Sequence, residues 1–286
     1  MEKEIVLKMT EIVKTFPGVK ALNGAHLNIY RGRVMALLGE NGAGKSTLIK
    51  IMTGIYQMDS GNIYLGNEKV NFKNVTDSQE RGIAVIHQEL NLIPELSITE
   101  NIFLGREPLT KLGTINHKQL YEDSKRFLEK QNLTYNPRMK MKEMSVGEQQ
   151  MIEIIKTVYF SSKIVIMDEP TSSLSEAEVK KLFNKIRELK ESGSTILYIS
   201  HRLEELDEIC DYLTVMRDGC FIKTAKVGEI TRNEIIYSMV GREITDIYPK
   251  ETAEIGNNIL RVEDINNDSV HHISFHLKRG EILGFA

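Results

Sequence analysis

The sequence predicts an α/β fold with a mainly parallel sheet, an antiparallel β region near the N-terminus and an inserted group of helices. Short apolar runs, typical of strands buried on both faces, alternate with amphipathic segments of helical period over most of the chain. A glycine-rich segment joins one of these strands to a helix. Between residues 97 and 160, three consecutive segments of helical period replace the alternation, which indicates a helical subdomain.

The N-terminal segment predicts antiparallel strands. Residues Ile5–Val13 and Leu27–Tyr30 have the composition of strands, and the segment Phe16–Lys20 predicts a loop between them. Phe16 is the only aromatic residue of this loop, and two roles for its ring stay open. The ring can stack on the adenine of a nucleotide, or it can pack beneath the loop.

The glycine-rich segment follows the predicted strand Val34–Leu38 and matches the phosphate-binding pattern G-x-x-x-x-G-K-[ST] in full. Its glycines let the backbone direct N–H groups at an anion, and the next helix adds the positive end of its dipole. The sequence therefore predicts a nucleotide-binding P-loop NTPase. The predicted contacts are Gly39, Glu40, Asn41, Gly42, Ala43, Gly44, Lys45, Ser46 and Thr47.

Three side chains of this loop have distinct expected roles. Lys45 supplies a positive charge for the β- and γ-phosphates and is a catalytic candidate, Ser46 offers a hydroxyl to Mg²⁺, and Thr47 is a further phosphate donor. A glycine-rich turn with an exposed lysine is the structural alternative. The complete pattern, placed between a strand and a helix, favours the functional interpretation.

Between the phosphate loop and the helical segment, the chain predicts a hairpin of residues 62–65 and 69–72, a helix of 76–81 and a strand of 83–86. Gln88 follows this strand, at the end where parallel sheets bind ligands. We therefore expect Gln88 to reach Mg²⁺ or an attacking water. The alternative is a solvated loop glutamine.

Capping residues predict where the helices begin. The expected boxes are Ser97 with Glu100, Ser145 with Glu148 and Ser175 with Glu178, and Asn116 and Thr231 are single caps.

Two carboxylates follow the buried strand predicted from Ile164 to Met167. Because the strand is apolar throughout, its acidic end should emerge at the ligand-binding edge of the sheet. We expect Asp168 to hold Mg²⁺ and Glu169 to accept a proton from attacking water. Two solvated acids are the alternative, which the phosphate loop upstream makes less favoured.

The strand predicted from Thr195 to Ile199 ends at Ser200 and His201. A histidine at that edge can hydrogen-bond a γ-phosphate, although an isolated one is more often structural. The remaining chain predicts a hairpin of residues 212–217 and 220–226 around Asp218-Gly219 and a helix ended by Gly241.

Composition excludes several other classes. The formal net charge of −3 gives no electrostatic footprint for nucleic acid. Cys210 and Cys220 have no metal or redox spacing, and a guanine-binding N-K-x-D element is missing. The N-terminus lacks the apolar core of a signal peptide, and no apolar run has the length of a membrane span.

Together these motifs resemble the nucleotide-binding domain of ABC transporters. The ordered set is Phe16, the phosphate loop, Gln88, the signature Met144-Ser-Val-Gly-Glu148, Asp168-Glu169 and His201. Within the family, several short sequence segments resemble those of monosaccharide importers. The resemblance is closest to the galactose and methyl galactoside type, and ribose and xylose relatives share much of the same sequence. These segments are PGVKAL, ENGAGKST, HQELNL, DEPTSSL and YISHR.

The resemblance implies a RecA-like sheet and an ATPase that works as a pair. Two such domains would sandwich two ATP molecules with Mg²⁺, and Ser145 and Gly147 would contact the γ-phosphate of the partner's ATP. It also implies permease subunits, an external sugar-binding protein acting indirectly, and a peripheral place on the cytoplasmic face of the membrane. The signature keeps Ser145 and Gly147 of the usual L-S-G-G-Q and differs at Met144, Val146 and Glu148, of which Glu148 adds a negative charge near the expected γ-phosphate.

The C-terminal residues repeat the N-terminal ones. Leu260–Ile265 aligns with Leu7–Ile12, and Phe275–Gly284 aligns with Leu27–Ala36. We therefore expect three parts: a nucleotide-binding domain at residues 1–241 with its helical subdomain at about 97–160, a linker at 242–258, and a truncated start of a second such domain at 259–286.

Two other functions compete with sugar import. A translation factor of the same family would need basic surfaces and a longer charged linker, and a DNA-repair ATPase would need a long coiled-coil insertion. The sequence has neither. The second alternative is an ATP-binding module that hydrolyses little ATP when it is on its own.

Overall fold

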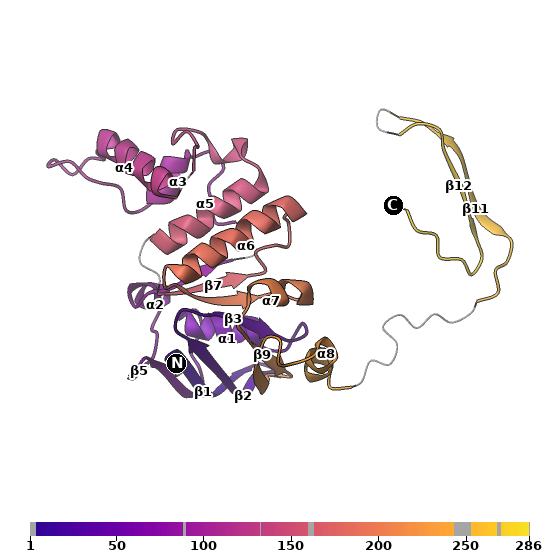
Figure 1. The fold of residues 1–286 in the computed structure, drawn as a ribbon, viewed down its shortest axis with the longest axis horizontal. Helices are drawn as coiled ribbons and strands as arrows, with labels where there is room; N and C mark the ends of the chain where they lie inside the picture. Colours follow the sequence, from indigo (N-terminus) through magenta and orange to yellow (C-terminus); the bar gives the residue numbers. More distant parts are fainter. Residues whose placement is uncertain are drawn as a thin grey trace. The chain divides into compact units, whose positions relative to one another are not determined.

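The structure, a computed structural model, describes residues 4–87, 90–131, 133–159, 163–242, 253–267 and 270–285. The chain divides into two units, residues 1–243 and 244–286. The first unit contains a six-stranded sheet and a four-stranded antiparallel sheet with the helices α1 to α8 (Figure 1). The predicted α/β class is confirmed.

The central sheet has the strand order β10-β9-β3-β8-β7-β6. The neighbours from β9 to β6 run parallel, and β10 pairs antiparallel with β9 at the edge. The strands are β3 (Val34–Leu38), β6 (Ile83–Ile86), β7 (Ile164–Asp168), β8 (Thr195–Ile199), β9 (Tyr212–Arg217) and β10 (Cys220–Lys226). All were predicted, because their apolar runs are strongly patterned.

Alternate side chains of these strands enter different cores, as the two-residue period of a strand requires. In β3, Met35 and Leu37 join a core that includes helix α1 (Lys45–Met52). Val34 belongs to the core containing helix α6 (Glu176–Glu191), on the other face of the sheet. The central sheet is therefore covered on both faces, which leaves its strand ends open to a ligand.

The antiparallel sheet has the order β2-β1-β4-β5, and its strands are β1 (Ile5–Phe16), β2 (Val19–Tyr30), β4 (Ser60–Leu65) and β5 (Glu68–Val70). The loop predicted at residues 16–20 is much shorter in the structure. The two strands continue to a turn at Pro17 and Gly18, where Gly18 has φ +81°. Strand pairing therefore extends further than the composition indicated.

The helical region contains α3 (Ile98–Phe103), α4 (His117–Lys130), the 3₁₀ turn η1 (Met141–Glu143) and α5 (Val146–Tyr159). The capping box of Ser97 and Glu100 is present, and the side chain of Asn116 accepts from the backbone of α4. These helices share a core with Phe127 and Ile155 among its buried members.

The remaining helices are α2 (Val75–Glu80), α7 (Leu203–Ile209) and α8 (Arg232–Val240). α2 and α8 were predicted, whereas α7 was not. α7 follows the end of β8 directly and buries Leu206 and Ile209, with Leu203 partly buried. Among the described residues, no helix combines the length and apolarity needed to cross a bilayer.

The second unit contains a hairpin of β11 (Asn258–Ile265) and β12 (Ile273–Lys278). Under the predicted repeat alignment, five of its strand pairs correspond to pairs of the β1–β2 hairpin. These are 258–278 with 5–30, 260–277 with 7–29, 261–276 with 8–28, 262–275 with 9–27, and 265–273 with 12–25. Glu11 and Asp264 occupy matching positions, and both have positive φ, +53° and +49°.

Candidate functional site

The phosphate loop starts where β3 ends and continues into α1. Gly44 is the N-cap of α1 and has φ +94°, and a Cβ there would lie 2.8 Å from the carbonyl oxygen of Ala21. Gly39 has φ +153°, and a Cβ there would overlap the backbone of Met216. Both positions therefore require glycine for backbone conformation and for close packing.

Lys45 lies inside this loop. Its Nζ donates to the carbonyl oxygens of Gly39, at 2.6 Å, and Glu40, at 3.0 Å. Desolvation lowers the pKa of Lys45, while the charges of Glu169 and Asp168 raise it. The two carboxylates are therefore close enough to act on this ammonium group, although more than 120 residues separate them in sequence.

Strand order brings four of the predicted polar groups to one edge of the sheet. β8 lies between β3 and β7, so its carboxyl end stands beside the phosphate loop on one side and beside Asp168 and Glu169 on the other. The His201 Nδ1 lies 3.2 Å from the Glu169 Oε1. This edge thus gathers a lysine, two carboxylates and a histidine.

Glu169 has an unusual backbone for a residue other than glycine, with φ +47°. Its N–H donates to the carbonyl oxygen of Ile199 at 3.0 Å, which ties the ends of β7 and β8 together. Such conformations persist only where the surrounding structure fixes them, and they cluster at functional sites. The turn directs the Glu169 carboxylate to His201.

The donor set fits Mg²⁺. Burial raises the pKa of Asp168, and the neighbouring charge of Glu169 raises it further, so a nearby cation would favour its ionised form. In the described part of the chain, no group of three His, Cys, Asp or Glu side chains is arranged to hold a metal. Mg²⁺ with a nucleotide needs only one or two protein oxygens beside phosphates and water, so Ser46 and Asp168 would be enough to hold the ion.

A cavity of about 640 Å³ lies over the phosphate loop. Phe16 lines it together with the residues from Asn41 to Thr47, and Asp218 and Gly219 complete one side. The edge of the Phe16 ring also packs on Tyr56, with centroids 5.2 Å apart. The ring therefore both faces the cavity and packs within the protein, which combines features of the two roles left open by the sequence.

We predict that Phe16→Ala weakens ATP binding by at least about five-fold, the lower end of the roughly 1–3 kcal/mol that stacking of a base on an aromatic ring contributes. Tyr56→Ala removes the packing partner of Phe16 without removing a cavity-lining ring. Fluorescence titration with an ATP analogue compares the two variants. Equal losses would show that Phe16 acts only through packing.

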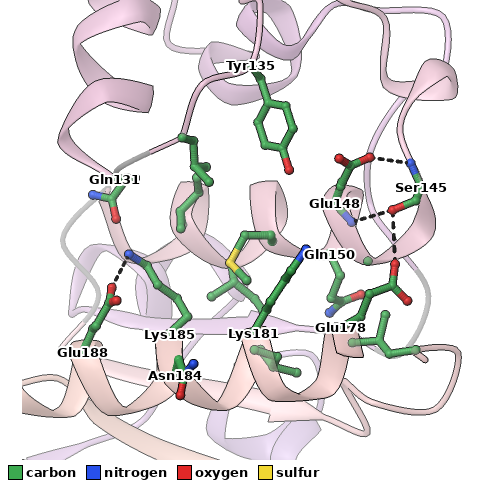
Figure 2. Close-up of a pocket in the computed structure, with 17 residues that line it drawn as sticks. Gln131, Tyr135, Ser145, Glu148, Gln150, Glu178, Lys181, Asn184, Lys185 and Glu188 are labelled. Atoms are coloured by element: carbon green, nitrogen blue, oxygen red, sulfur yellow. Dashed lines mark hydrogen bonds and ion pairs between the residues drawn. The ribbon is translucent and has the colours of Figure 1, made fainter. Parts of the chain in front are cut away.

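The signature residues lie at the N-terminus of α5. Ser145 and Glu148 form the predicted capping box, with Ser145 N donating to the Glu148 Oε2 at 2.8 Å and Glu148 N donating to the Ser145 Oγ at 3.3 Å. Figure 2 shows Ser145 also bonded to Glu178 of α6. The Ser145 Oγ donates to the Glu178 Oε1 at 3.2 Å. The group lines a cavity of about 400 Å³ between α5 and α6.

Glu178 joins two helix N-termini. Its Oε2 accepts from the backbone N–H and the hydroxyl of Ser175, at 3.0 and 2.8 Å, which is the predicted capping box of α6. Hydrogen bonds from Ser175, and then from Ser145 and Gly147, hold the pKa of Glu178 below its ordinary value. A side chain at Gly147 would collide with Glu178. The signature donors therefore have an internal carboxylate partner that the sequence did not indicate.

Gln88 lies outside the described residues, so its predicted contact stays a prediction.

Comparison with known proteins identifies the family of this chain. A family model described as ABC transporter matches residues 22–172, more than half of the chain. The chain belongs to the ABC transporter family.

This member of the ABC transporter family is also similar to the ribose import ATP-binding protein RbsA of Caldanaerobacter subterraneus subsp. tengcongensis. The two are 48% identical over 284 residues, which is 99% of this chain and 57% of that protein. This ABC chain thus spans little more than half the length of this curated relative.

Solved structures agree with the ABC assignment. A nucleotide-free ATP-binding cassette from an ABC transporter is 28% identical, with a TM-score of 0.69 over 83% of this chain and 96% of that one. An ATP-binding cassette in its ADP conformation is 28% identical, with a TM-score of 0.71 over 83% of this chain and 99% of that one. The predicted ABC ATPase fold is therefore confirmed.

Proposed function

We propose that residues 1–241 bind ATP with Mg²⁺ and hydrolyse it to power the import of a monosaccharide through a membrane permease. The observation that carries the proposal is the sheet edge where Lys45, Asp168, Glu169 and His201 meet beside the phosphate loop. Phosphoryl transfer needs positioning and charge stabilisation more than covalent chemistry, and these groups supply both.

Each residue has a role in this proposal. The loop N–H groups and Lys45 hold the β- and γ-phosphates, and Ser46 and Asp168 hold Mg²⁺, which neutralises charge on the phosphates. Glu169 takes the proton of the attacking water, and His201, next to it, hydrogen-bonds the γ-phosphate. Gln88 completes the predicted set at the metal and the water.

Hydrolysis in this proposal requires a second nucleotide-binding domain, either another copy or a further domain. Ser145 and Gly147 of one domain would contact the γ-phosphate bound by the other, because a helix N-terminus suits an anion. The permease would engage the helical region, an external sugar-binding protein would act through the permease, and the chain would work at the cytoplasmic face of the membrane. The RbsA relative favours transport over the translation and DNA-repair functions.

The sequence-based preference for galactose has no support in the comparisons, since the relative at 48% identity is named for ribose. We propose a monosaccharide as the cargo and ribose as the first sugar to test. In this proposal the permease and the external sugar-binding protein select the cargo.

The proposal predicts that the chain binds and hydrolyses Mg·ATP, and that Lys45→Ala weakens both activities by at least ten-fold, because the phosphates lose their point charge. Lys118→Ala is the control, because Lys118 is an exposed lysine on α4, outside the phosphate loop. Phosphate release and nucleotide titration measure the two activities. For the cargo, the gene that encodes this protein should restore growth on ribose to bacteria lacking their own ribose-import ATPase. Restoration on galactose alone would select the other sugar.

A further inference from the structure

A buried carboxylate lies beside the proposed catalytic edge without belonging to any motif. Glu205, on the unpredicted helix α7, is 5% exposed. Three hydroxyl groups donate to it: Thr171 Oγ1 to its Oε1 at 2.7 Å, and Ser200 Oγ and Tyr198 OH to its Oε2 at 2.7 and 2.8 Å. Thr171, Tyr198 and Ser200 are also buried.

The three donors come from two segments of the chain, one that follows β7 and one that includes the end of β8. Thr171 stands two residues after Glu169, beyond the end of β7. Ser200 immediately precedes His201 at the end of β8, and Tyr198 lies within β8 itself. The Glu205 carboxylate therefore links the segment that carries Glu169 to the segment that carries His201. The Nδ1 of His201 lies 3.2 Å from the Oε1 of Glu169.

A purely structural reason for this group is weak. Burying a carboxylate costs free energy, and its hydrogen bonds offset this cost without adding much net stability. An apolar residue of similar size at the same position often makes the folded protein equally or more stable. Arg202 offers only a long contact, with its Nη1 3.7 Å from the Glu205 Oε1. What the carboxylate adds is direction, because hydroxyl donors to an ionised oxygen are strong and geometrically specific.

We propose that Glu205 is a positioning residue for ATP hydrolysis, which holds the Glu169 and His201 segments in register through Thr171 and Ser200. This inference rests on the proposed function of Glu169 and His201. Glu205 touches neither ATP nor water in this scheme. It acts by fixing where the two side chains stand, and misplacement of a catalytic group by about 1 Å can cost a hundred-fold in rate.

Thr171→Val tests the link, because valine keeps the shape and removes the hydroxyl. We expect kcat for ATP to fall about ten-fold or more, while the Kd for ATP stays within about two-fold, since the phosphate loop is untouched. Thr171→Ser keeps a hydroxyl and should recover most of the lost turnover. Tyr198→Phe is the control: it removes a bond to the same carboxylate without releasing either segment end, and its kcat should stay within about two-fold.

Thermal unfolding of every variant separates position from stability. The inference is overturned if Thr171→Val turns over at the wild-type rate, or if Thr171→Val and Tyr198→Phe lose activity equally in proportion to their loss of Tm. Glu205→Gln provides a second measurement, with a fall in kcat at constant Kd expected. A wild-type chain that pairs with Mg·ATP and still hydrolyses it no faster than Glu169→Gln would instead refute the proposed function itself.

Discussion

Glu169→Gln is expected to bind ATP normally and to hydrolyse it between about 10² and 10⁴ times more slowly, the usual cost of removing a general base. The amide occupies the same volume and can still hydrogen-bond His201, whose Nδ1 lies 3.2 Å from the Glu169 Oε1. Its oxygen cannot take the proton of the attacking water. The variant should therefore accumulate with ATP bound, and sedimentation with Mg·ATP should reveal pairs that do not form without nucleotide.

Glu176→Gln is the control for this experiment, because it removes the same charge from an exposed position on α6. It should hydrolyse ATP as the wild type does. Full turnover by Glu169→Gln would move the base role to another group, and failure to pair with Mg·ATP would count against the sandwich arrangement.

Glu178→Gln is expected to strengthen ATP-driven pairing on the order of ten-fold. In the structure the Glu178 carboxylate uses the donors of Ser145 and Gly147, the two signature residues proposed to contact the partner's γ-phosphate. A phosphate and a carboxylate at the same N–H group repel each other, so pairing must displace Glu178. An amide lacks the charge and has a single acceptor oxygen, which the cap at Ser175 can use.

Concentration-dependent sedimentation in the Glu169→Gln background measures this effect without hydrolysis. Glu148→Gln is the matched comparison, because Glu148 also accepts from Ser145 but through the backbone N–H. We expect it to leave folding almost unchanged and to alter pairing less than Glu178→Gln does. Weaker pairing in Glu178→Gln would show that the carboxylate supports the signature, and unchanged pairing in both would exclude a role for these charges.

The local signals of the sequence predicted local structure well. The phosphate loop, the caps at Ser97 and Asn116, and the apolar strand before Asp168 each depend on neighbouring residues, and each is present. α7 was missed although Leu203, Leu206 and Ile209 have helical spacing, because Arg202 provides no side-chain cap and the helix is only seven residues long.

The missed parts of the candidate site depend on tertiary contacts. Ser145 and Glu178 are separated by 33 residues, and Thr171 and Glu205 by 34. In sequence, Glu178 is only a capping-box residue, and Glu205 is one acid among several in an acidic segment. Their second roles exist because α5 packs near α6 and α7 folds back on the strand ends, which no spacing rule encodes.

The matched registers of the two hairpins bear on how this chain folds. In the first hairpin, Leu7 and Ile29 pair in a closed core, whereas in the second Leu260 is 46% exposed and still pairs with Leu277 at the corresponding position. The left-handed residues Glu11 and Asp264 place the same irregularity in both. Register in this motif is thus a property of the two strands themselves. The chain therefore contains one hairpin register twice, once covered by a closed core and once with Leu260 exposed.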